Sequence, residues 1–223
     1  MSTDTKFRDP PLSLETIAAT LAPFWIELSP GQLKSIQDYV GLLLLWNQSI
    51  NLMATEDPVE IVSRHFGESL FAASFLDIGD SRLADVGTGG GFPGLALKIG
   101  FPSAKITLFE SNSKKCAFLR EVVERLRIIG VDIRRQRYDE FETEAGGFDF
   151  VCARALGDYP SMLRWARHAL APGGKVVLWL GRDESIRLGR RKEFIWDAPV
   201  AVPESRRRVV LVGRVRQQEK CFT

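Results

Sequence analysis

The stretch LADVGTGGGFPGLALKI, residues 83–99, carries the strongest structural signal in the chain. Five of the eight positions from 87 to 94 are glycine, and an apolar run lies on either side of them. LADVG has the length and composition of a buried strand, and GLALKI is typical of a helix, so the glycines form the loop between them. The run AKITLFE, residues 104–110, follows as a second strand. This order predicts a strand–loop–helix–strand unit with parallel strands.

The chain beyond residue 82 repeats this alternation as far as Gly181. Short apolar runs that alternate with helical patterns are typical of a parallel sheet with helices on both faces. Two further β-like runs flank Pro203 and predict an antiparallel pair at the sheet edge. The predicted fold class is therefore α/β, with a Rossmann-like, doubly wound, mainly parallel sheet and an antiparallel C-terminal edge.

The chain before residue 79 shows helical spacing and no strand pattern. Ser13 and Asp57-Pro58 have the residue types that begin helices, and Pro30-Gly31 precedes a further helical pattern. We therefore expect a helical N-terminal extension over residues 1–78 and a single sheet-containing domain over residues 79–223.

The composition is that of a soluble globular protein, with 45% hydrophobic and 26% charged residues. No apolar run approaches the ~20 residues of a membrane-spanning helix, and the N-terminus lacks the layout of a signal peptide. The three cysteines, Cys116, Cys152 and Cys221, are odd in number and far apart. An odd number of widely separated cysteines argues against a disulfide framework and against a zinc site. We expect a cytoplasmic protein with no membrane segment and no metal site.

Positive charge is concentrated in two places, although the formal net charge is only +2. Residues 182–216 contain ten Lys and Arg against five Asp and Glu, and residues 134–137 read RRQR. Localised positive charge can neutralise the phosphates of a nucleic acid. The alternative is a solvated face on a mildly basic protein.

Three classes of ligand-binding loop contain glycines in this pattern, and the neighbouring residues distinguish them. A P-loop continues with Lys-Ser/Thr, whereas Phe92 and Pro93 follow here. A dinucleotide needs backbone N–H donors at the helix start, and Pro93 removes one. Asp85, two residues before Gly87, would repel a pyrophosphate and attract a sulfonium and its ammonium group. The arrangement resembles the first motif of class I S-adenosylmethionine-dependent methyltransferases.

The next two strands end in further candidate ligands of the cofactor. Glu110 lies about twenty residues beyond the glycine loop, where an acidic side chain binds ribose hydroxyls. Asp139, with the backbone of Tyr138, follows the third strand and could accept a hydrogen bond from the exocyclic amine of adenine. Glu140 and Glu142 are competing acceptors.

Several segments together resemble the ribosomal RNA small-subunit methyltransferase G family, also called glucose-inhibited division protein B. The glycine loop ends in Gly-Phe-Pro-Gly, which is more specific to this family than a generic glycine-rich loop. The helical lead over residues 42–70, the run FDFVCARAL at 148–156 and the run LAPGGKVVLWLG at 170–181 are similar to segments of that family. The likeness covers roughly residues 35–215.

This family methylates N7 of one guanine in 16S ribosomal RNA with S-adenosylmethionine, so the resemblance implies that reaction. It implies 16S RNA or the small ribosomal subunit as partner. We expect no DNA partner, and nothing in the sequence demands more than a monomer. The implied cofactor-binding residues are Asp85, Gly87, Gly89, Gly91, Phe92, Glu110, Tyr138, Asp139 and Arg154. Two residues depart from the family pattern: Leu180 stands where a lysine is common, and Glu68 where aspartate is common.

Arg154 follows the fourth predicted strand and is the expected residue nearest the chemistry, where it would orient the substrate. A structural role, pairing with Asp85 or Glu110, is the alternative. The candidate RNA-binding residues are Arg64, His65, Lys114, Arg182, Arg206 and Arg207, and Lys115 and Arg208 are further candidate phosphate contacts.

Three other functions remain alternatives. The first is methylation of another RNA or of a small molecule, and the second is a cofactor-binding module without transfer activity. A dinucleotide oxidoreductase is disfavoured by Pro93 and Asp85.

Overall fold

The computed structural model describes residues 10–142 and 147–216, so Cys221 lies outside the described residues. The N-terminal helical part consists of α1 (Leu14–Leu21), η1 (Ala22–Phe24), α2 (Pro30–Asn47), α3 (Pro58–Ile61), η2 (Val62–Gly67), α4 (Glu68–Phe71) and η3 (Ala72–Ser74). It is followed by β1 (Arg82–Val86), α5 (Gly94–Gly100), β2 (Lys105–Phe109), α6 (Ser113–Arg125), β3 (Val131–Arg134) and η4 (Tyr138–Glu140). The remainder is β4 (Phe148–Arg154), α7 (Tyr159–Ala169), β5 (Leu170–Gly181), α8 (Arg182–Gly189), β6 (Phe194–Trp196), β7 (Val200–Ala201) and β8 (Arg208–Val215).

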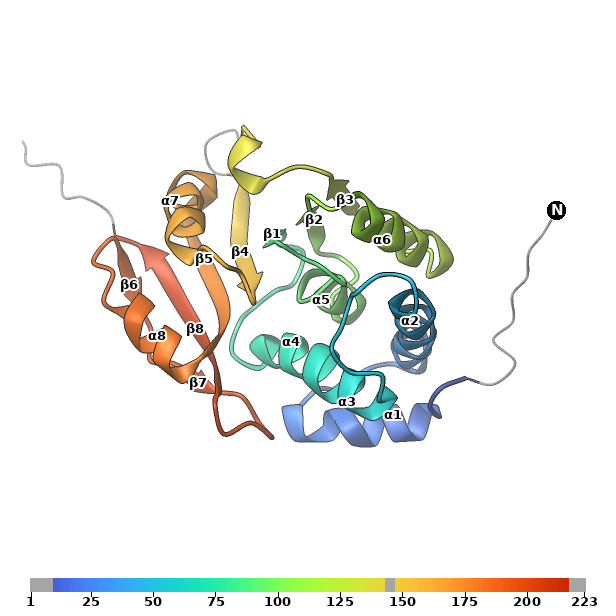
Figure 1. The fold of residues 1–223 in the computed structure, drawn as a ribbon. Helices are drawn as coiled ribbons and strands as arrows, with labels where there is room; N and C mark the ends of the chain where they lie inside the picture. Colours follow the sequence, from blue (N-terminus) through green and yellow to red (C-terminus); the bar gives the residue numbers. More distant parts are fainter. Residues whose placement is uncertain (1–9, 143–146, 217–223) are drawn as a thin grey trace, which may run out of the picture.

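Within the described residues, eight strands form one sheet in the order β3-β2-β1-β4-β5-β8-β6, and β7 pairs with β8 (Figure 1). The strands β1 to β5 are parallel. β8 runs antiparallel to β5, β6 and β7. The predicted fold class is confirmed, including the antiparallel C-terminal edge. β8 lies between β5 and β6, so the last strand within residues 147–216 is not the edge strand.

Alternate residues along the strands bury their side chains on opposite faces of the sheet. Leu83, for example, belongs to a core that contains residues of the N-terminal helices, α5 and α6. Ala84 belongs to a second core, which contains residues of α7 and α8. The N-terminal helices therefore share a hydrophobic core with one face of the sheet.

The predicted helix starts are confirmed. Ser13 is the N-cap of α1, and Asp57 is the N-cap of α3 with Pro58 at the first helical position. Ser29 forms a capping box with Gln32 at the start of α2, one residue before the predicted Pro-Gly start.

Polar contacts fix α2 against the sheet-containing part of the chain. Gln32 Nε2 donates to the carbonyl oxygens of Ile99, at 2.8 Å, and Gly100, at 3.0 Å, where α5 ends. The buried Tyr39 hydroxyl donates to Gly90 O at 2.7 Å. These contacts reach the glycine loop and the C-terminal end of α5, so α2 supports the loop from outside the sheet.

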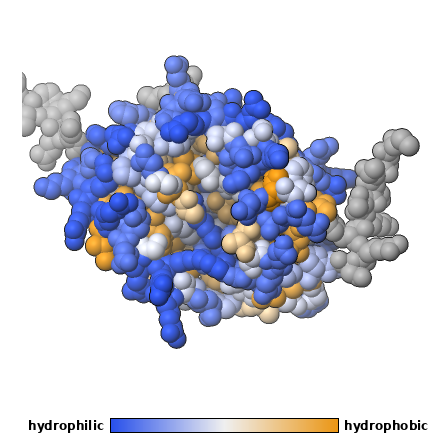
Figure 2. Space-filling model, in the orientation of Figure 1, coloured by the Kyte–Doolittle hydropathy of each residue, from blue (hydrophilic) through white to orange (hydrophobic). Residues whose placement is uncertain are grey.

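The face of the molecule shown in Figure 2 is mainly hydrophilic, with small hydrophobic patches between the polar residues. Among the described residues, no helix is both long enough and apolar enough to cross a membrane.

Candidate cofactor and substrate site

The glycine loop joins the carboxyl end of β1 to α5 with three residues in left-handed backbone, Gly87, Gly89 and Gly91. Five loop amides already donate to acceptors within the protein, namely those of Gly87, Thr88, Gly89, Gly91 and Phe92. A pyrophosphate binds through free N–H donors, so it would compete with bonds that the loop already makes. The space above Gly89 is open, because a Cβ built there would meet only the Gly87 carbonyl oxygen, at 3.9 Å. The loop therefore fits a ligand that packs against backbone better than one that takes its N–H groups.

Asp85 holds this loop to the start of α5 from beneath. Its carboxylate is fully buried, and Oδ2 accepts from Thr88 Oγ1 at 2.6 Å and from Gly94 N at 2.7 Å. Oδ1 is buried and has no hydrogen-bond partner among the described residues. Burial raises the pKa of Asp85 to about 6, while the bonds from Thr88 and Gly94 and the charge of Arg154 oppose the shift.

We expect Asp85→Asn to change the pH dependence of stability. The folded-state pKa of Asp85 is raised from 3.8 to about 6, so the stability contributed by its protonated form is lost as the pH rises through about 6. From about pH 4.5 to pH 7.5 the wild type should therefore lose ~2 kcal/mol of unfolding free energy relative to the variant. Urea unfolding of both proteins at the two pH values measures this difference. The contributions of the other titrating groups are the same in both proteins and therefore cancel. A difference independent of pH would contradict it.

Glu110 follows β2 and faces the same loop. Oε2 accepts from Gly89 N at 3.1 Å, and Oε1 accepts from Asn112 N at 2.8 Å. Each oxygen keeps a lone pair, because a carboxylate oxygen can accept two hydrogen bonds. The carboxylate is thus held in one orientation and can accept bonds from a pair of hydroxyl groups.

Tyr138 and Asp139 lie in η4, beyond β3. The Tyr138 ring is buried against Trp165, with centroids 5.4 Å apart. Asp139 is exposed and pairs through both oxygens with Arg137, at 3.0 and 2.9 Å. This bond is the main cause that lowers the pKa of Asp139. An adenine amine at Asp139 would share a carboxylate that Arg137 already binds.

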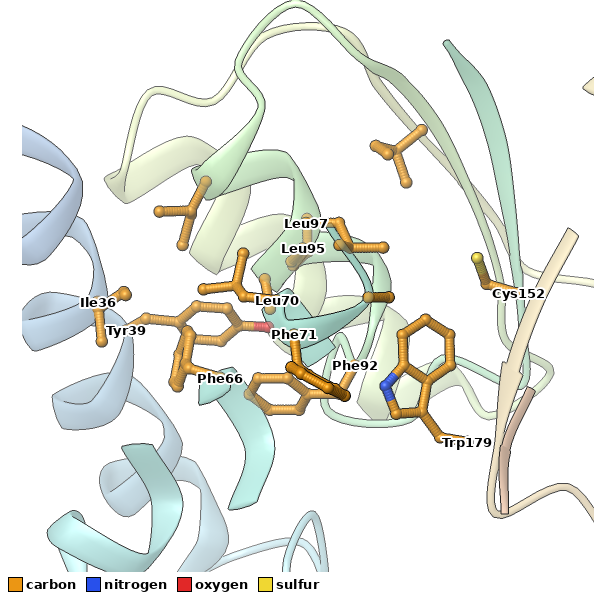
Figure 3. Close-up of a cluster of buried hydrophobic side chains, with 14 of the residues drawn as sticks. Ile36, Tyr39, Phe66, Leu70, Phe71, Phe92, Leu95, Leu97, Cys152 and Trp179 are labelled. Carbon is orange, nitrogen blue, oxygen red and sulfur yellow. The ribbon is translucent and has the colours of Figure 1, made fainter. Parts of the chain in front are cut away.

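Phe92 packs away from the loop into the core. Its ring stacks on Tyr39, with ring centroids 5.6 Å apart, and meets Phe66 edge-on, with centroids 5.0 Å apart. Figure 3 shows these three residues in one buried cluster. The Phe92–Pro93 peptide bond is cis. Because the ring is buried, a ligand of the loop would meet the backbone of Phe92.

Arg154 ends β4 and meets the helical lead. Its Nη2 lies 3.6 Å from Glu68 Oε2 and 3.4 Å from His65 Nδ1, and both of these residues come from the helical segment around η2. The other oxygen of Glu68 pairs with Arg208 Nη1, at the start of β8. The Glu68 side chain is only 6% exposed, so one buried carboxylate bridges two arginines.

The charge states in this cluster follow from burial. Burial, and then the positive charges of Arg154, Arg64 and Arg208, lower the pKa of His65 to about 3. The ring is therefore neutral near pH 7 and would meet RNA through hydrogen bonds rather than charge. Burial lowers the pKa of Arg154 to about 10, against the opposing charge of Glu68, so Arg154 stays protonated.

A cleft of about 600 Å³ opens beside Arg154, at the carboxyl ends of β4 and β5. We call it the arginine cleft, and its lining includes Glu68, Arg154, Leu156, Tyr159, Arg207 and Arg208.

The remaining RNA-binding candidates are exposed, and they are Arg64, Lys114, Arg182, Arg206 and Arg207. The structure brings Arg182 and Arg207 together, since Arg182 N donates to Arg207 O at 3.0 Å. Arg64 pairs with Glu60. Lys114 lies in the first turn of α6, after β2, and is not among the residues that line the arginine cleft.

Comparisons with known proteins identify the family of this chain. A family model described as rRNA small subunit methyltransferase G matches residues 32–200. The chain belongs to this family. A member from Pseudomonas aeruginosa is 37% identical over 70% of this chain and 70% of its own length. One from Pseudomonas fluorescens is 33% identical over 90% of this chain and 94% of its own length. Both carry the name ribosomal RNA small subunit methyltransferase G.

Solved structures of low sequence identity share the fold. A SAM-dependent methyltransferase from Aquifex aeolicus aligns with a TM-score of 0.60 at 14% identity, over 72% of this chain and 94% of its own. A tRNA (m1A58) methyltransferase from the same organism aligns with a TM-score of 0.55 at 17% identity, over 67% and 68% of the two chains. At 14% and 17% sequence identity, the likeness to these structures shows a shared fold and no more.

One residue at the centre of the cluster, Glu68, was not among the predicted site residues. Glu68 was noted only as a departure from the family pattern, and its signal was a charge between apolar residues of the helical lead. Arg208 begins β8, and strand alternation places it on the face of Val210 and Val212. Arg208 is one of the predicted phosphate contacts, and that alternation distinguishes it from its exposed neighbour Arg207.

Proposed function

We propose that this chain transfers a methyl group from S-adenosylmethionine to N7 of a guanine in 16S ribosomal RNA. The observation that carries the proposal is the pairing of two features at one sheet edge. The glycine loop, with its amides internally bonded and the fixed carboxylate of Glu110 beside it, suits a nucleoside without a pyrophosphate. Arg154, buried and charged, ends the neighbouring strand β4. Membership of the family supports the RNA substrate.

The donor would be held by residues that the fold already orients. Glu110 is suited to the ribose hydroxyls, and Tyr138 with Asp139 to the adenine edge. The backbone at Gly87, Gly89, Gly91 and Phe92, with the buried charge of Asp85 beneath it, is suited to the methionine part. S-adenosylmethionine supplies a methyl group bound to a positively charged sulfur. The neutral thioether that remains after transfer is a good leaving group.

Guanine N7 makes few demands on the protein. It has an in-plane lone pair and no proton at neutral pH, so its methylation needs no general base. Holding the reactants in line can lower the barrier by up to ~7–11 kcal/mol. Arg154 can contribute by donating to guanine O6 or to a phosphate, and the neutral ring of His65 lies beside it.

The test is a map of 7-methylguanosine in 16S RNA from three strains: the wild type, a deletion, and a strain that carries Gly89→Ala. The added methyl group would occupy the open space above the loop, so the modification should be absent from both altered strains. A map that is unchanged by the deletion would reject the RNA assignment.

Calorimetry of the purified protein separates the remaining alternatives. S-adenosylmethionine should bind the wild type and bind Gly89→Ala more weakly, whereas tight binding of NAD alone would favour an oxidoreductase. Donor binding without methyl transfer to small subunits or extracted RNA would indicate a binding module. We further propose that the protein acts as a monomer on 16S RNA or the small subunit in the cytoplasm.

A further inference from the structure

The arginine cleft has the size and position of a second ligand site beside the glycine loop. Its volume of about 600 Å³ falls within the range of roughly 300–1,000 Å³ that small-molecule sites span. It opens at the carboxyl ends of β4 and β5, the edge at which α/β sheets bind ligands.

The cleft combines positive charge with an apolar wall. Arg187 is paired with Glu184 at 2.6 Å, which leaves the positive charge of Arg154, Arg207 and Arg208 opposed in the lining only by Glu68. Aromatic and aliphatic side chains complete the lining, among them Tyr159, Trp179 and Leu156. Tyr159 and Trp179 are themselves buried, so they form the floor of the cleft rather than an exposed stacking face. Guanidinium groups bind phosphates, and an apolar floor can pack against a base, so this lining suits a nucleotide.

The cleft and the glycine loop adjoin at Leu156. Leu156 lines the cleft, and a Cβ at Gly87 would lie 3.1 Å from Leu156 Cδ1, so the two sites share this wall. Ala155 has a φ of 52°, in the left-handed region that non-glycine residues rarely adopt. This turn carries the chain from Arg154 to Leu156 at the point where the sites meet.

The polar groups of the wall are incompletely paired. Arg154 Nη1 is buried and has no hydrogen-bond partner within the described part of the chain. A buried donor without an acceptor is unfavourable, so an acceptor on a ligand would be stabilised here. Arg208 has a side chain that is 31% exposed and pairs with Glu68 through one nitrogen, so it is free to take a second anion.

We propose that the arginine cleft holds the acceptor nucleotide of the RNA, with a phosphate on Arg208 and a base oxygen on Arg154. The ligand is a purine nucleotide turned out of a single-stranded segment. Glu68 acts as a positioning residue: it binds both arginines in the free protein, releases Arg208 to the phosphate and keeps Arg154 in place. This inference rests on the proposed function, since it names where the RNA of that reaction binds.

The first test replaces Arg208 by alanine in the full chain, with small ribosomal subunits from a deletion strain as substrate. The KM for subunits should rise about tenfold, and the salt slope of binding should fall by about one. Donor affinity should not change. The matched control is Arg214→Ala, on the same strand, where the exposed Arg214 pairs with Asp197. Arg214→Ala should leave the KM for subunits and the salt slope of binding as in the wild type.

The second test concerns Glu68. Glu68→Gln removes the carboxylate that competes for Arg208 and holds Arg154, so KM should fall while kcat also falls. Glu68→Asp keeps the charge and should restore most of kcat. A variant that loses only thermal stability, with both constants unchanged, would show that Glu68 is merely structural.

The outcomes separate this inference from the function on which it rests. Wild-type protein that methylates no guanine of the subunit overturns the proposed function. If the wild type is active but Arg208→Ala matches Arg214→Ala in KM and salt slope, the function stands and the cleft does not hold the nucleotide.

Discussion

Replacing Gly91 by alanine should destabilise the protein by at least ~3 kcal/mol, measured by urea unfolding. A Cβ at this position would lie 1.9 Å from the Tyr39 hydroxyl oxygen and 2.9 Å from Leu95 Cδ1. Tyr39 is fully buried and cannot move aside without losing its bond to Gly90 O. The φ of Gly91 is 90°, which adds backbone strain for any other residue.

Gly90 provides the control, one position away in the same loop. A Cβ there would meet Leu43 at 3.6 Å and Phe92 at 3.8 Å, which are ordinary contacts. Gly90→Ala should therefore leave stability within about 1 kcal/mol of the wild type. Combining Gly91→Ala with Tyr39→Phe removes the oxygen at 1.9 Å, so the glycine substitution should be less destabilising in that background. Equal losses for Gly90→Ala and Gly91→Ala would contradict this account.

The contrast between these glycines shows what the sequence could and could not predict. Local periodicity and turn chemistry predict the glycine loop, its place between β1 and α5, and the parallel direction of the strands. The structure confirms all three. That Gly91 is less tolerant of a side chain than Gly90 depends on Tyr39, which bonds Gly90 from 51 residues away along the chain. Local patterns carry no information about a contact of that sequence separation.

The candidate site divides in the same way. Glu110 and Arg154 could be located because strand ends of a parallel sheet meet at one edge. The partners of Arg154 could not be predicted. His65 and Glu68 reach it from the helical lead, and no local pattern specifies how that lead packs against the sheet. Asp85 was predicted from its charge, whereas the structure shows in addition that it bonds the loop to α5.

Arg154→Met should lower the rate of methyl transfer by ~100-fold at saturating RNA and donor, the order of loss expected when a reacting group is misplaced by about 1 Å. Arg154 is buried, protonated and held by Glu68, so the substitution removes a positive charge that no mobile surface residue can replace. Arg154→Lys should recover little, because a lysine lacks the planar fork that reaches two acceptors. Single-turnover kinetics measure the rate.

A readout independent of activity shows whether the charge itself has been removed from the cluster. The charge of Arg154 is the second cause, after burial, that lowers the pKa of His65 to about 3. In Arg154→Met the His65 pKa should therefore rise, while in Arg154→Lys, which retains a positive charge, it should stay low; NMR titration of the His65 ring measures both. If Arg154→Met raised this pKa but left the transfer rate unchanged, Arg154 would be an electrostatic neighbour of His65 with no part in orienting the substrate. If both variants lost activity while only the methionine variant changed the pKa, the loss would follow from the geometry of the guanidinium group rather than from its charge.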